Sequence, residues 1–315
     1  MPTCLRSLWL SWMATLILAP SASAVTIDWT FVGDPGNAAD SSGFGSVAYA
    51  YQISTYEITN SQYAEFLNAV AGADPYELYD AGMGSGFGGL TRDGAPGSYS
   101  YSAIAGREDM PVNYVSWYDV LRFANWLNNG QGGADTETGA YTLEGGTPTP
   151  LNFATLARNA GAIIFLTSED EWYKAAYYDA LSVSYFDYPA GSNTPTTCGD
   201  PTAVPNRANC NFSVGDLTIV GSYTGSASPY GTFDQGGNVA EWNETNIGGT
   251  AHGQRGGYFT TTADSLSAQS RGFVLNQPTG RDNIGFRVAS IPEPSTGILL
   301  ALGMIGLAGW RRPRA

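Results

Sequence analysis

The chain has 315 residues, of which 43% are hydrophobic and 13% are charged, and its formal net charge at pH 7 is −14. A surface this acidic repels phosphate backbones, which argues against a nucleic-acid-binding protein. Divalent cations and neutral, hydroxyl-rich ligands suit such a surface better.

Residues 1–24 are predicted to be a cleavable secretion signal. Arg6 is the only charge among the first 27 residues, an apolar stretch runs from Leu8 to Leu18, and Ala22-Ser23-Ala24 is a small-x-small cleavage pattern. This order is typical of a secretory signal peptide, with Val25 as the first residue after cleavage. A membrane anchor is the alternative, but a span needs about 20 apolar residues, more than this run provides.

A lead-in at residues 25–44 is followed by one expected strand and one expected helix. Residues 46–57 alternate in the manner of a strand, with one face formed by Tyr49, Tyr51, Ile53 and Thr55. Thr59 or Asn60 then caps a helix whose apolar face holds Tyr63, Phe66, Leu67 and Val70. Residues 72–110 are predicted to be loop.

Two further helices and three short strands are expected after residue 110. Ser116 caps a helix that begins at Trp117, and Ser168 with Glu171 forms a capping box for another, which carries Trp172. The strands are predicted at residues 162–166, 255–259 and 285–290. We interpret Trp117, Trp172 and Trp242 as core residues. The pattern indicates an α+β fold, rich in loops, with little regular secondary structure.

Cysteine usage indicates one disulfide. Cys4 leaves with the secretion signal, so Cys198 and Cys210 remain, 12 positions apart, in an oxidising compartment. A disulfide that closes this loop is the favoured interpretation. Two sulfurs alone are too few for a structural zinc site.

The C-terminal residues 291–315 resemble the Pro-Glu-Pro sorting signal (PEP-CTERM) of bacteria that make extracellular polysaccharide. Pro292, Glu293 and Pro294 precede an apolar segment at 296–310 and a basic end at 311–314. The resemblance implies a transient inner-membrane anchor, an exosortase-type protease as partner, and passage from the periplasm to the cell surface or extracellular matrix. A plain C-terminal anchor is the alternative, although about 15 apolar residues are marginal for a permanent span.

Six blocks in the central part, within residues 45–290, resemble the formylglycine-generating enzyme family, also called sulfatase-modifying factors. They are residues 56–60 (YEITN), 110–117 (MPVNYVSW), 166–172 (LTSEDEW), 237–242 (GNVAEW), 255–258 (RGGY) and 285–288 (GFRV). The resemblance implies the family's variant of the C-type lectin fold, which agrees with the loop-rich pattern.

The catalytic chemistry of that family depends on residues that this chain lacks. In the resembled enzymes, two cysteines shortly after the Arg-Gly-Gly block bind copper and oxidise a substrate cysteine, and copper(I) needs soft thiolate ligands. Residues 255–271 hold no cysteine, which argues against copper and against formylglycine generation. An iron site would need two histidines and a carboxylate, but His252 is the only histidine, and we expect it in an exposed loop.

Calcium remains as a structural cofactor that the resemblance implies, because loop carbonyls and carboxylates supply the hard oxygens it prefers. The first implied site uses the side chains of Asp234 and Glu241 with the carbonyls of Gly237 and Val239. The second uses the side chains of Asn209 and Asp216 with the carbonyls of Cys210 and Thr218. The alternative is that Asp234 and Glu241 simply cap turns.

The candidate cleft is formed by Arg255, Tyr258 and Arg287, although both arginines are more simply read as partners of buried acids or carbonyls. The favoured function is a non-catalytic, calcium-stabilised binding module of the surface or matrix, with extracellular polysaccharide or a surface protein as its partner. The alternative is an enzyme of the same superfamily with a different oxidative activity on a protein or small molecule. A true formylglycine generator is the third possibility.

Overall fold

The computed structural model of the chain describes residues 24–248, 251–274 and 280–292. The predicted signal up to residue 23, Glu293, Pro294, the apolar segment and the basic end lie outside these residues. No helix within the described part of the chain is long and apolar enough to cross a membrane. Val25, the expected first residue after cleavage, is buried, and its N–H and carbonyl both bond to the Gln131 amide.

The first sheet joins both ends of the domain. Its strand order is β1 (Trp29–Val32), β2 (Tyr51–Ser54), β14 (Val288–Ser290) and β5 (Ile164–Leu166), and all neighbours are antiparallel. Tyr51 and Ile53 are fully buried, as the alternation predicts. The strand is shorter than the predicted 46–57, and Tyr49 is 41% exposed.

The second sheet carries the segment that leads into the candidate cleft. Its order is β12 (Gly272–Val274), β11 (Ala251–Arg255), β10 (Ala240–Gly248) and β13 (Ile284–Phe286), and β10 and β13 run parallel. The predicted strand at 285–290 is two strands, because the chain passes from the second sheet to the first between β13 and β14. Arg287 lies at this crossing.

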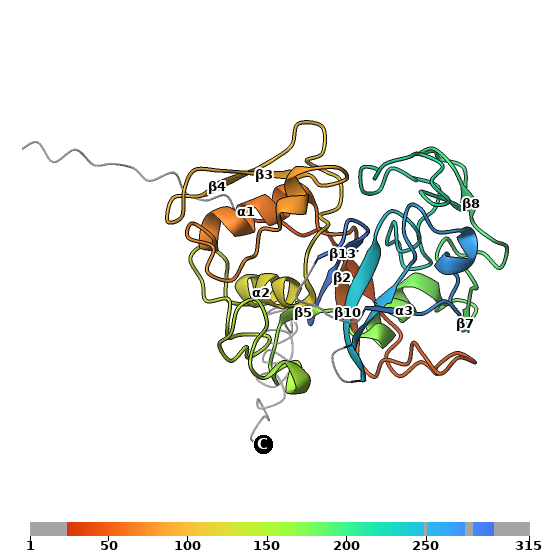
Figure 1. The fold of residues 1–315 in the computed structure, drawn as a ribbon. Coiled ribbons are helices and arrows are strands. Elements are labelled where there is room, and N and C mark those ends of the chain that lie inside the picture. Colours follow the sequence, from red (N-terminus) through yellow and green to blue (C-terminus); the bar gives the residue numbers. More distant parts are fainter. Residues whose placement is uncertain (1–23, 249–250, 275–279, 293–315) are drawn as a thin grey trace, which may run out of the picture.

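Three helices begin where the sequence predicts them. They are α1 (Asn60–Val70), α2 (Trp117–Asn128) and α3 (Glu169–Tyr177), and each follows a complete capping box, formed by Thr59 with Gln62, Ser116 with Asp119, and Ser168 with Glu171. Such a box satisfies N–H groups that a helix start leaves unpaired. Figure 1 shows α1 and α2 on one side of the central strands β2, β5, β10 and β13, and α3 on the other.

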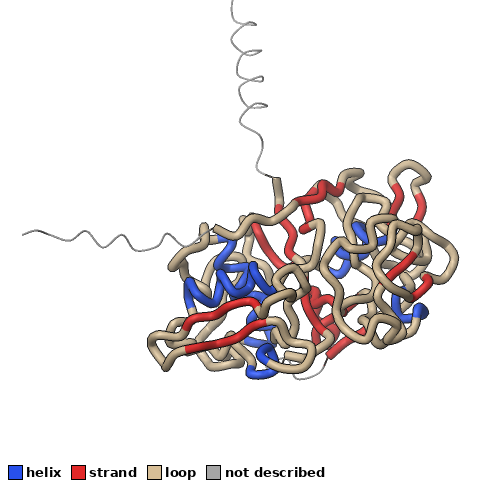
Figure 2. Tube along the Cα trace, turned by 90° about the horizontal axis from the view of Figure 1, so that it is seen from above, coloured by secondary structure: helices blue, strands red, loops and turns tan. Residues whose placement is uncertain are grey.

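Loops make up most of the remaining chain, as Figure 2 shows. The prediction of loop at 72–110 missed a hairpin of β3 (Leu90–Asp93) and β4 (Ser100–Ala103), which packs on α1. Two-residue strands also form two small pairs: β6 (Tyr178–Asp179) with β7 (Ser184–Tyr185), and β8 (Thr197–Cys198) with β9 (Arg207–Ala208). Short 3₁₀ turns are η1 (Ala81–Gly84), η2 (Phe153–Thr155) and η3 (Ala263–Leu266). The predicted loop-rich α+β class is confirmed.

Aromatic side chains dominate the core. Phe123 of α2 packs edge-on against Phe66 of α1 and Phe286 of β13, with ring centroids 5.3 and 5.2 Å apart. Such contacts add to the stabilisation that comes from burial alone. Trp117, Trp172 and Trp242 are at most 1% exposed, which confirms their prediction as core residues.

Candidate functional site

The candidate cleft begins where β11 ends. Gly256 and Gly257 have φ angles of +98° and +64°, and a Cβ on Gly256 would lie 2.9 Å from the carbonyl oxygen of Gln235. These glycines therefore turn the chain out of the sheet. The prediction of a strand at 255–259 is wrong for this reason: the strand ends at Arg255, and Tyr258 lies on the following loop.

The cleft that this turn creates has a volume of about 130 Å³. Hydroxyl groups, glycine backbone and the two arginines Arg255 and Arg271 line it, together with Tyr258, Thr261, Ser265 and Ser270. Tyr258 and Thr261 bond to each other through backbone and hydroxyl groups, which fixes the turn. The lining contains no thiol. Its hydroxyl groups offer hydrogen bonds to a polar ligand.

A buried ion cluster supports the floor of the cleft. Glu169, at the start of α3, accepts from Arg255 Nε at 2.8 Å and pairs with Arg271 Nη2 at 2.5 Å. Arg255 also donates to the carbonyls of Ala268 and Ser270, at 3.0 and 2.7 Å. Glu169 therefore fixes Arg255, which holds residues 268–270 through their carbonyls, and Arg271, which lines the cleft. Glu169 and Arg271 were not predicted as site residues, because they come together from segments 102 residues apart.

The structure does not place Arg287 in the cleft with Arg255 and Tyr258. Arg287 is fully buried and forms a two-pronged ion pair with Glu241, with Nε–Oε2 and Nη2–Oε1 distances of 2.6 and 2.8 Å. It also donates to the carbonyls of Ser54, Thr55 and Phe233. Arg287 therefore joins the two sheets to each other and to the loop that contains Phe233. This agrees with the prediction that it pairs with buried acids or carbonyls.

Two more carboxylates lie near this ion pair. Burial is the main reason that the pKa of Asp234 rises to about 6; the N–H of Gly221 and the charge of Arg287 oppose the rise. Burial also raises the pKa of Glu57 well above its ordinary range, and the charges of Asp234 and Glu241 add to that rise. Arg287 is thus the cation that balances a group of buried acids.

The first implied calcium site fits these contacts poorly. Glu241 is 1% exposed, and its oxygens accept from Arg287 and from Trp172 Nε1, the latter at 2.6 Å. A guanidinium on the same carboxylate repels a calcium ion. Asp234 accepts from the Gly221 N–H at 2.5 Å, as a turn-capping residue does.

The second implied set fits better in one respect. Asn209 is fully buried, and its Oδ1 atom has no hydrogen-bond partner among the described residues. Its Nδ2 atom donates to the Asp216 carbonyl at 2.8 Å, so both calcium-ligand candidates lie together. The Asp216 carboxylate pairs with Arg107, which would have to shift to admit an ion. Calcium at this set stays a prediction.

Adding calcium to purified protein is expected to raise the free energy of unfolding by about 2.7 kcal/mol at a hundredfold excess over the dissociation constant. Asp216→Asn should abolish this gain because it removes the charged ligand, whereas Asp200→Asn, at an exposed position, should not. Denaturant unfolding with calcium or with chelator measures the difference. An equal calcium response in both variants would contradict the assignment.

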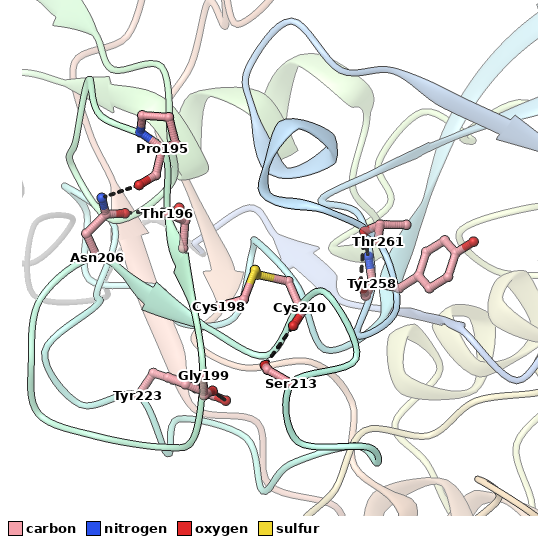
Figure 3. Close-up of a disulfide and its surroundings, with 10 residues drawn as sticks. All are labelled: Pro195, Thr196, Cys198, Gly199, Asn206, Cys210, Ser213, Tyr223, Tyr258 and Thr261. Atoms are coloured by element: carbon pink, nitrogen blue, oxygen red, sulfur yellow. Dashed lines mark hydrogen bonds between the residues drawn. A yellow bond between two sulfur atoms is a disulfide. The ribbon is translucent and has the colours of Figure 1, made fainter.

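Cys198 and Cys210 form the predicted disulfide, with their Cα atoms 4.9 Å apart. Figure 3 shows the Tyr258 ring pointing away from this bond. The loop after Cys210 is nevertheless tied to the cleft, because the N–H groups of Asn211 and Phe212 donate to the carbonyls of Thr261 and Phe259, both at 2.7 Å. The disulfide thus braces a loop that is hydrogen-bonded to the segment forming the cleft.

Replacing both cysteines with serine is expected to lower the free energy of unfolding by about 3 kcal/mol, because the unfolded chain regains the freedom of a short closed loop. The loss should be matched by reduction of the wild-type protein with dithiothreitol, to which the variant should not respond. Thermal unfolding of the serine variant and of the reduced wild type measures both losses. If the wild-type protein is equally stable after verified reduction, the disulfide does not stabilise the fold.

His252 does not lie in an exposed loop, as expected from the sequence. It is 1% exposed, lies on β11, and stacks on Trp117 with ring centroids 3.5 Å apart. Burial lowers its pKa from 6.5 to about 4, so it is neutral at physiological pH. The prediction failed because the sequence hides the pairing of β11 with β10.

His252 is expected to make the fold sensitive to mild acid. The unfolded chain binds a proton at this residue below about pH 6.5, whereas the folded chain does so only near pH 4. Stability from this source is therefore present above pH 6.5 and lost as the pH falls toward 4. The drop in unfolding free energy between pH 7 and pH 5 should be smaller by about 2 kcal/mol in His252→Phe. Equal drops in the wild type and in His252→Phe would show that His252 does not cause the acid sensitivity.

The fold is that of a domain like the formylglycine-generating enzymes, and the segment that forms the cleft, residues 255–271, holds no cysteine. The chain belongs to the family of the sulfatase-modifying factor enzyme 1-like domain, whose model matches residues 45–291. A second model, the PEP-CTERM protein-sorting motif, matches residues 290–312. This motif indicates export with membrane-associated sorting, and it implies processing by an exosortase-type system.

Among the solved structures that share the fold are CarF and Treponema denticola variable protein 1. CarF is 23% identical, with a TM-score of 0.57, over 85% of this chain and 99% of its own. Treponema denticola variable protein 1 is 18% identical, with a TM-score of 0.51, over 84% of this chain and 95% of its own. The comparison with curated protein sequences found no match.

Proposed function

We propose that the chain is a non-catalytic binding module of the cell surface or its polysaccharide matrix, delivered there by its sorting tail. The observation that carries the proposal is the chemistry of the cleft after Arg255. Its lining presents the hydroxyls of Tyr258, Thr261 and Ser265 in the segment where the resembled enzymes carry copper-binding cysteines. Hydroxyls do not replace thiolates as ligands of copper(I).

The ligand that this cleft favours is neutral and rich in hydroxyl groups. Arg255 and Arg271 share the single carboxylate of Glu169, so one of their two positive charges is balanced and both guanidinium groups are already engaged within the protein. Tyr258 offers a half-buried ring beside backbone and hydroxyl groups, and an apolar face with a few placed polar groups is typical of small-ligand sites. A sugar unit of the matrix polysaccharide has this character.

The test compares binding of the exported protein to polysaccharide extracted from the host matrix. Ser265→Trp fills the cleft and should weaken binding by at least about tenfold, whereas Ser98→Trp, on an exposed turn of the β3–β4 hairpin, should leave it unchanged. Equal binding by both variants would sink the proposal. So would stoichiometric copper(I) together with oxygen-dependent oxidation of a Cys-x-Pro-x-Arg peptide.

A further inference from the structure

A larger cavity, of about 400 Å³, lies between the lead-in, the β2–α1 turn and two loops. It shares no lining residue with the cleft after Arg255. The acidic and apolar side chains of its lining that matter for ligand preference are Ile27, Asp28, Glu57, Asp109, Ile219 and Val220. Three of these are acids, three are apolar, and no lysine or arginine is in the lining.

The innermost acid, Glu57, has an unsatisfied oxygen. Its side chain is 1% exposed, and Oε1 has no hydrogen-bond partner among the described residues, while Oε2 accepts from Asn238 Nδ2 at 3.2 Å. Burying a carboxylate without a partner is costly, which is why the pKa of Glu57 is raised by burial. A cation placed beside Oε1 would favour the charged form again. Arg287, whose charge acts on Glu57, is already committed to Glu241 and three carbonyls. Glu57 therefore lacks a cation of its own.

The other two acids lie at the mouth of the cavity. Asp28 and Asp109 are exposed, and the described residues supply no ion pair to either of them or to Glu57. Their backbone carbonyls accept from Thr55 at 2.7 Å and Val220 at 2.9 Å, so the walls are braced. Acids at an entrance attract a cation from solution, and a buried one stabilises it inside.

The start of α1 does not reverse this charge preference. Its terminal N–H groups would favour an anion if they were free. However, the N–H groups of Asn60 and Ser61 donate to the carbonyls of Met110 and Glu108, both at 3.0 Å, and the N–H of Gln62 donates to the Thr59 hydroxyl. These donors are used within the protein, so the three carboxylates decide which ligand the cavity favours.

We propose that this cavity binds a primary alkylammonium group, such as the side chain of a lysine on a partner protein. The ammonium pairs with Glu57, while the methylene stem packs between Ile27, Ile219 and Val220. A metal ion fits less well, because the described residues include no group of three histidine, cysteine or acidic side chains placed to hold one. The inference does not depend on whether the cleft after Arg255 binds a sugar.

The test follows the isoleucine methyl signals of the full-length protein by NMR. The probes are pentylamine and the tripeptide acetyl-Gly-Lys-Gly-amide, with pentanol and the norleucine tripeptide as neutral controls of the same shape. We expect the amines to shift Ile27 and Ile219 with a dissociation constant on the order of 1 mM. Binding of the lysine tripeptide alone identifies a protein partner's side chain, and binding of both identifies the alkylammonium class.

Two variants separate the proposal from general attraction to an acidic protein. Glu57→Gln keeps the side-chain volume and should weaken amine binding by at least about tenfold. Asp109→Asn, at an exposed position, should weaken it by about threefold, and Asp93→Asn, exposed on β3, should have no effect. The proposal is overturned if the amines bind no better than the neutral controls, or if Asp93→Asn weakens binding as much as Asp109→Asn.

Discussion

Replacing Arg287 with methionine is expected to lower the free energy of unfolding by about 3–5 kcal/mol, because the change leaves Glu241 buried without its partner. The loss is large for this chain in particular. Arg287 faces Glu241 at 2.6 Å and also acts on the buried carboxylates of Glu57 and Asp234. Without the guanidinium, several acids would share one dry region with no cation.

Equilibrium unfolding in urea, followed by tryptophan fluorescence, measures this loss. Arg281→Met, at an exposed position six residues earlier, is the matched control and should change the unfolding free energy by less than about 0.5 kcal/mol. The double variant Arg287→Met, Glu241→Leu should recover part of the loss, since it removes both charges. If Arg287→Met is as stable as wild type, the ion pair has no structural role.

Glu169→Ala is expected to destabilise the protein by a similar amount, about 3–5 kcal/mol, and to open the cleft as well. Glu169 is 2% exposed and is the shared partner of Arg255 and Arg271. Without it, two guanidinium groups repel each other. Arg255 would then hold the carbonyls of Ala268 and Ser270 less firmly.

Hydrogen exchange measures whether Glu169→Ala also opens the cleft. The backbone amides of residues 268–272 should exchange faster in Glu169→Ala, and their loss of protection should exceed the global loss of stability. Glu144→Gln, an exposed acid, should leave both stability and exchange unchanged. A uniform increase in exchange across the whole chain would mean that Glu169 contributes to stability but does not shape the cleft.

Helices, the disulfide and the core tryptophans could be predicted because their signals are local. A capping box needs only residues three apart, as at Ser116 and Asp119, and a twelve-residue spacing suffices to suggest the Cys198–Cys210 bond. The family blocks are equally local strings. For these features, sequence neighbours are also neighbours in space.

The ion clusters and the cavities could not be predicted, because their members come from distant segments. Glu169 meets Arg255 across 86 residues, and Arg287 meets the Ser54 carbonyl across 233. Nothing near Glu57 in the sequence indicates that one of its oxygens lacks a partner. His252 was misplaced for the same reason, since only the pairing of β10 with β11 places it on Trp117.

The position of β14 sets an order of events for an exported chain. This strand, which ends just before the sorting tail, lies between β2 and β5 and bonds to both. The early strands therefore cannot complete their sheet until nearly the last residue of the domain is available to pair with them. In an exported chain, the sheet that joins both ends of the domain is thus completed last, by the strand next to the sorting motif.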